Sequence, residues 1–146
     1  MSRAGILTAL RNYSPLTSVV PANAIVPNYS RDERPSKDGP FIIIRWEEST
    51  LYSQTYTGMS NGLDRAPRTI TVWAHVPREN TTDFWVLDNI LNLVDDALVY
   101  LEHVDGGDGY TITCVRKSGR SRDLVDEGYN TITRNAAYGV LSRATV

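Results

Sequence analysis

The chain has 146 residues, of which 41% are hydrophobic and 22% are charged. That length is typical of one domain with a sizeable core, and the composition argues against a disordered chain. The 15 basic and 17 acidic residues give a formal charge of −2, which argues against a protein whose main task is to grip nucleic acid.

Residue types that hold metals or disulfides are scarce. Cys114 is the sole cysteine and cannot form an internal disulfide, and His75 and His103 are few for a metal site. The N-terminus becomes polar too soon for a secretory signal, and the apolar run at 41–44 is far shorter than the roughly 20 residues of a membrane-spanning helix. We therefore expect a cytosolic origin, with no metal, no cofactor and no membrane attachment.

Two short helices and a long polar loop are predicted first. Ala4, Leu7 and Leu10 recur at helical spacing. A second helix restarts at residues 14–16, where proline follows a serine. Residues 27–40 are polar, and too little chain precedes them to form a core, so they predict an exposed loop and not a domain boundary.

The middle of the chain predicts strands. Residues 41–49 begin as a continuous apolar run, as in a sheet interior, and residues 51–56 suit an extended ribbon. Residues 57–67 are rich in breakers and predict a second exposed loop. Residues 68–76 alternate, with Trp73 and His75 on one face. Their other face carries only apolar side chains: Ile70, Val72, Ala74 and Val76.

The strongest pattern is an amphipathic helix after Pro77. Asn80, Thr81 or Thr82 can cap it, and Asp83 suits the positive end of the helix dipole. The apolar stripe is Phe84, Leu87, Leu91, Val94, Leu98 and Leu101, and the opposite face carries Asp88, Asn92, Asp95 and Asp96.

The C-terminal third predicts a turn at 105–109, a strand at 110–117 and a ribbon at 129–143. Fully extended at about 3.3 Å per residue, that ribbon would span ~50 Å, so we expect part of it to bend or to serve another subunit. The order of elements predicts a single α+β domain over residues 1–146, with a mostly antiparallel sheet and two main helices on one face.

One acidic cluster raises the question of catalysis: Asp123, Asp126 and Glu127. Two-carboxylate catalysis needs burial that raises one pKa, whereas the neighbouring residues have the composition of an exposed turn. A solvated turn or an inter-subunit salt bridge is therefore favoured. The glycine-rich turn at 105–109 lacks the ligand spacing of a calcium loop. We expect no catalytic, metal-binding or cofactor-binding residues.

Basic and aromatic residues indicate a binding role. Arg116, Lys117, Arg120 and Arg122 lie within seven residues, but acids follow them and no aromatics interleave, so a protein partner is favoured over nucleic acid. Eight tyrosines and three tryptophans outnumber two phenylalanines, a bias found at protein interfaces, although each can equally line a sheet face. The candidate tyrosines are Tyr52, Tyr56, Tyr100, Tyr110, Tyr129 and Tyr138.

Three segments carry a family resemblance: SPLTSVVPANAIVP at 14–27, the strand, proline and helix at 68–98, and TRNAAYGVLSR at 133–143. Together they resemble the tail terminator proteins of long-tailed bacteriophages, also called tail completion or tail-to-head joining proteins. The likeness covers most of the chain. It rests on the order of elements, since no single motif is diagnostic.

The resemblance implies a virion protein, assembled in the host cytoplasm, that forms a homohexameric ring on the tail tube at the neck. The ring would end tube polymerisation and present a surface to the head-completion, or stopper, protein. DNA would pass through the lumen without specific binding. Another connector or minor tail protein at the same joint, and a small nucleic-acid-binding protein using residues 116–122, are the alternatives.

A closed ring needs contacts between two different patches of the same chain. We expect the 51–67 ribbon and loop to meet a neighbouring subunit or the tube through Tyr52, Tyr56, Met59 and Leu63. The basic segment would form ion pairs across the subunit boundary, with Arg116, Arg120 and Arg122 facing Asp123, Asp126 and Glu127.

Overall fold

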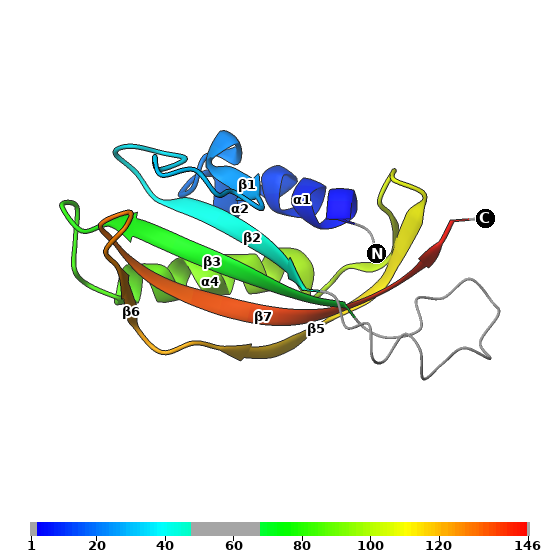
Figure 1. Cartoon of the computed structure of the whole chain (residues 1–146). Coiled ribbons are helices and arrows are strands. Elements are labelled where there is room, and N and C mark those ends of the chain that lie inside the picture. The colour runs from blue at the N-terminus through cyan, green and yellow to red at the C-terminus, as the bar shows by residue number, and fades with distance from the viewer. Residues whose placement is uncertain (1–2, 48–67, 146) are drawn as a thin grey trace.

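A seven-stranded, mostly antiparallel sheet runs through the computed structural model, which describes residues 3–47 and 68–145 (Figure 1). The strand order is β1-β2-β3-β7-β5-β4, and β6 pairs with β7. Only the β1–β2 pair is parallel among these strands. The strands are β1 (Ile25–Pro27), β2 (Phe41–Glu47), β3 (Arg68–Pro77), β4 (Glu102–Asp105), β5 (Tyr110–Arg120), β6 (Leu124–Asp126) and β7 (Thr131–Ala144).

The strand register gives the sheet two different faces. Residues directly opposite each other share a face, so Ile43, Trp73 and Asn135 lie on one side of the sheet. The next residues along the strands, including Ile44 and Val72, lie on the other side and are fully buried. The predicted inward face of the 68–76 strand is therefore confirmed.

The helices gather on this second face. The described helices are α1 (Arg3–Asn12), α2 (Ser14–Thr17), the 3-10 turn η1 (Ala22–Ala24) and α4 (Trp85–Leu98). Helix α4 buries Leu87, Ile90, Leu91 and Val94 completely, and these side chains share one core with residues of the sheet. The predicted α+β class, with its helices on one face, is confirmed, and no described helix is long and apolar enough to cross a membrane.

The second main helix is shorter at both ends than its pattern predicted. It begins at Trp85, whose backbone N–H donates to the Asp83 carboxylate over 3.0 Å, so Asp83 fills the capping role predicted for residues 80–82. The helix ends at Leu98, and residues 102–105 form β4. This strand is too short and acidic to be recognised alone, and it exists because it pairs with β5.

The long closing ribbon is the central strand of the C-terminal half. Strand β7 pairs with β3 along one edge and with β6 and β5 along the other, so neither edge is left for another subunit. Its length is accommodated by bending instead. Two irregularities in β5, next to Cys114 and Gly119, help the sheet to curl.

The predicted loop at 27–40 is anchored at one end of the sheet. Arg34 donates hydrogen bonds to the carbonyls of Tyr129 and Asn130, over 2.6 and 3.0 Å, and pairs with Glu79. The Tyr129 hydroxyl donates to the Arg31 carbonyl over 2.7 Å. The loop is therefore bound to the turn between β6 and β7. The predicted ribbon and loop at 51–67 lie outside the described residues.

Replacement of Leu91 by alanine tests the assignment of the core. Leu91 is fully buried in α4, so Leu91→Ala should lower the free energy of unfolding by about 2–5 kcal/mol, measured by urea denaturation. Asp96→Ala on the exposed side of the same helix should change it by less than about 0.5 kcal/mol. Equal effects from the two variants would contradict the burial of this helix face.

Candidate functional site

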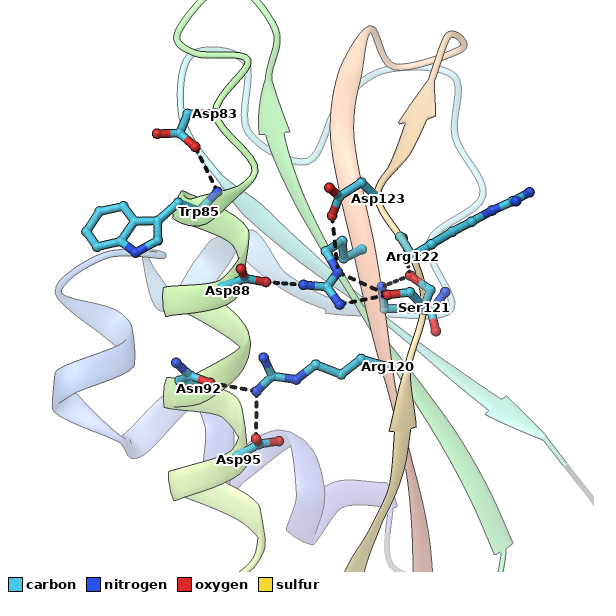
Figure 2. Close-up of polar contacts among 11 residues, drawn as sticks. Asp83, Trp85, Asp88, Asn92, Asp95, Arg120, Ser121, Arg122 and Asp123 are labelled. Carbon is cyan, nitrogen blue, oxygen red and sulfur yellow. Dashed lines mark hydrogen bonds and ion pairs between the residues drawn. The ribbon is translucent and has the colours of Figure 1, made fainter.

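A charged seam joins α4 to the far edge of the sheet (Figure 2). We define it as Asp88, Asn92, Asp95, Lys117, Arg120, Ser121, Asp123, Arg134 and Tyr138. Asp88, Asn92 and Asp95 are spaced by four and three residues, so they line one side of the helix. The remaining members come from β5, β7 and the segment that leads to β6.

Asp95 is the centre of the seam. It is only 7% exposed, although the helical pattern placed it on the solvent side. One carboxylate oxygen accepts the hydroxyl proton of Tyr138. The other accepts Arg120 Nη2 over 2.7 Å and lies 3.5 Å from Lys117 Nζ. Arg120 Nη2 also donates to Asn92 Oδ1 over 2.7 Å, so one guanidinium binds two turns of the helix.

The tyrosine in this contact is a hydrogen-bond donor at every ordinary pH. Tyr138 is fully buried, and that burial raises its pKa far above the usual value; the hydrogen bond to Asp95 raises it further. A protonated phenol satisfies a buried carboxylate without adding charge. The contact therefore fixes α4 against the central strand β7.

A second contact of the seam is built on Arg134 of β7. Its guanidinium donates to the Asp88 carboxylate and, over 3.0 and 2.8 Å, to the carbonyl of Ser121. Asp123 Oδ1 lies 3.5 Å from Arg134 Nε. Asp123, one of the acids questioned in the sequence, thus helps to neutralise an arginine of the same chain.

An aromatic groove lies on the opposite face of the sheet, which we call the helix-free face because no described helix packs on it. This groove has a volume of about 310 Å³ less than a thousand, namely ≈ 660 Å³. Its lining includes Arg45, Trp46, Thr71, Trp73, His75, Asp126 and Tyr129. A second hollow of about 490 Å³ shares Arg45, Asp126 and Tyr129 and is walled by residues 30–32. The 27–40 loop therefore forms one wall of this surface.

Ring contacts order the base of the groove. His75 stacks on Phe41 with ring centroids 4.7 Å apart, and Tyr129 packs edge-on against both rings at 5.7 Å. His75 Nδ1 lies 2.8 Å from Thr131 Oγ1. Burial lowers the pKa of His75 to about 4, so the imidazole is neutral at physiological pH. The predicted structural role of His75 agrees with these contacts.

The structure separates the predicted interface residues. Arg120 and Asp123 belong to the seam, and Asp126 lines the groove, where it accepts the Tyr129 N–H over 3.0 Å. Arg116, Arg122 and Glu127 are exposed, and Arg122 points away from α4 in Figure 2. No ion pair joins the basic segment to these acids among the described residues. The remaining predicted residues, Tyr52, Tyr56, Met59 and Leu63, lie outside the described residues.

Sequence reasoning missed Arg45 as a site residue. Arg45 follows Phe41 and Ile43 at alternate positions, which places all three on one face once β2 is known to be a strand. Its position beside Asp126 and Tyr129 depends on contacts across more than 80 residues and had no local signal. Within the described part of the chain, no three histidine, cysteine or carboxylate side chains are grouped to hold a metal ion.

Comparisons with known proteins do not assign the chain to a family. The sequence matches no known protein family, and no curated protein matches it either.

The coupling between Asp95 and Tyr138 can be measured by a double-mutant cycle. Asp95→Asn leaves Arg120 without its buried counter-charge and should cost about 3 kcal/mol, and Tyr138→Phe should cost about 1–3 kcal/mol. Both variants together should cost at least about 1 kcal/mol less than the sum, because each removes the same contact. Additive losses would show that the two side chains do not interact.

Stability should depend on pH through His75. Its pKa is about 4 in the fold against 6.5 in the unfolded chain, so the unfolded state binds more protons between these values. Its contribution is complete above pH 6.5 and should fall by about 3 kcal/mol as the pH drops towards 4. His75→Gln should flatten this part of the curve of unfolding free energy against pH. His103→Gln, at an exposed position, should leave it unchanged.

Proposed function

We propose that this chain is a structural subunit of a bacteriophage tail that assembles with copies of itself into a ring at the head-proximal end of the tube. The ring ends tube polymerisation and offers a surface to the head-completion complex, while DNA passes through its lumen. Two lines support the proposal: the resemblance of the sequence segments to tail terminators, and the character of the helix-free face.

The aromatic groove is the observation that carries the proposal. Tryptophan, tyrosine and arginine are the residues most enriched at the centres of protein interfaces, and the groove combines Trp73, Tyr129 and Arg45 on one uncovered sheet face. A protein partner that covers this face would remove the tryptophan from water. This favours assembly as the role of the face.

Both edges of the sheet are poorly suited to pairing with another strand, which supports assembly through a face. Strand β1 has three residues and ends in Pro27, and the Arg11 guanidinium binds the Ile25 carbonyl over 3.1 and 2.7 Å. Strand β4 is exposed and acidic, and His103 has a left-handed backbone with φ of 54°. Short, charged and kinked edges resist edge-to-edge association.

The charges of the seam support a structural role over a catalytic one. Asp95, Arg120 and Arg134 are engaged with partners that hold α4 to the sheet. Because Lys117 and Arg120 are both directed at Asp95, the basic segment offers less free charge to nucleic acid than its sequence suggests. The nucleic-acid alternative requires salt-dependent DNA binding that is lost on replacing Arg116 and Arg122.

Imaging of virion necks and a pair of tryptophan variants test the proposal. Averaged images of tail tops should contain a ring-shaped layer of this chain, and Trp73→Ala should prevent the joining of heads to tails. Trp85→Ala is the matched control, because that indole is 64% exposed on the helix side and points away from the seam (Figure 2). Retained joining by Trp73→Ala, or its loss only in Trp85→Ala, would contradict assembly through the groove.

A further inference from the structure

The hairpin formed by β4 and β5 is an exposed apolar and acidic projection. Six large hydrophobic side chains are exposed in the described residues, and three of them, Tyr100, Val104 and Tyr110, belong to the segment 100–110. The same segment contains three acidic residues and no lysine or arginine. Clustered exposed hydrophobic side chains of this kind mark interaction sites.

The hairpin cannot reach the aromatic groove of its own chain. Its turn lies next to the start of α1, where Asp108 Oδ2 accepts the Ala4 N–H over 3.4 Å (Figure 1). Helix α1 packs on the helix-bearing face, whereas the groove opens on the helix-free face. Any contact between these two surfaces must therefore join different copies of the chain.

The two surfaces are complementary in chemistry. The groove offers the indole of Trp73 and the phenol ring of Tyr129 to apolar side chains, and it has one exposed cation, Arg45. Arg45 makes no ion pair with another described residue, and the groove's own carboxylate, Asp126, accepts the Tyr129 N–H. An arginine beside aromatic rings suits a partner that carries carboxylates beside apolar side chains.

We propose that the aromatic groove of each copy receives the β4–β5 hairpin of a neighbouring copy, with Val104 and Tyr110 against Trp73, and with Glu102 or Asp105 against Arg45. This inference rests on the proposed function, because it assumes that the chain assembles with itself. A contact between two unlike patches is head-to-tail, and repetition of such a contact closes a ring when the rotation allows it.

A disulfide experiment tests the contact directly. Two differently tagged chains, both with Cys114→Ser, would carry Val104→Cys in the hairpin and Thr71→Cys in the groove, alone and on tail tubes. Under mild oxidation we expect a disulfide between the two chains. The control pairs Val104→Cys with Val19→Cys, an exposed position on α2's side of the molecule, and should give at least about tenfold less cross-linked product.

A charge exchange tests the same contact without cysteines. Arg45→Glu alone and Glu102→Lys/Asp105→Lys alone should each weaken association about tenfold or more, and the combined variant should recover most of the loss. Circular dichroism would establish that each variant is folded. Association is measured by native mass spectrometry of the chain alone and by binding to purified tail tubes.

The outcomes separate this inference from the proposed function. Assembly of the unmodified chain without the 104–71 disulfide, or without recovery in the combined variant, overturns the hairpin contact and leaves the ring proposal standing. An unmodified chain that stays monomeric both alone and on tail tubes overturns both proposals.

Discussion

The buried carboxylate of Asp95 is the interaction on which the rest of the architecture depends. A buried charge is strongly unfavourable unless it is paired and hydrogen-bonded, and Tyr138 and Arg120 supply both conditions from β7 and β5. Because these two strands and α4 meet at one carboxylate, the rotation of the helix on the sheet is determined. Leu91 and its apolar neighbours then face the core.

This attachment places the helices together and leaves the other sheet face open to partners. On that face, packing of His75 against Phe41 and Tyr129 keeps the imidazole neutral and orders the base of the groove. The 27–40 loop, bound through Arg34, walls the adjoining hollow. The polar loop and the aromatic residues, which lie far apart in the sequence, thus contribute to one surface.

The distribution of these surfaces gives the proposed assembly a direction. The acidic hairpin lies beside the start of α1, and the groove lies on the opposite face of the sheet. With both sheet edges blunted, two unlike surfaces remain on each copy. Such an arrangement suits repeated head-to-tail contacts better than a symmetric pair, which uses the same patch twice.

The amino-acid pattern alone determined β2, β3, α4 and the α+β class, because burial on one side of an element imposes a local period of two or of three to four residues. Tertiary structure decided what depends on distant partners. Asp95 occupies the polar side of the helical pattern, yet it is buried because β5 and β7 bring Arg120 and Tyr138 to it from 25 and 43 residues away. Strand β4 and the groove around Arg45 arise in the same way, since pairing across the sheet leaves no trace in the spacing of neighbouring residues.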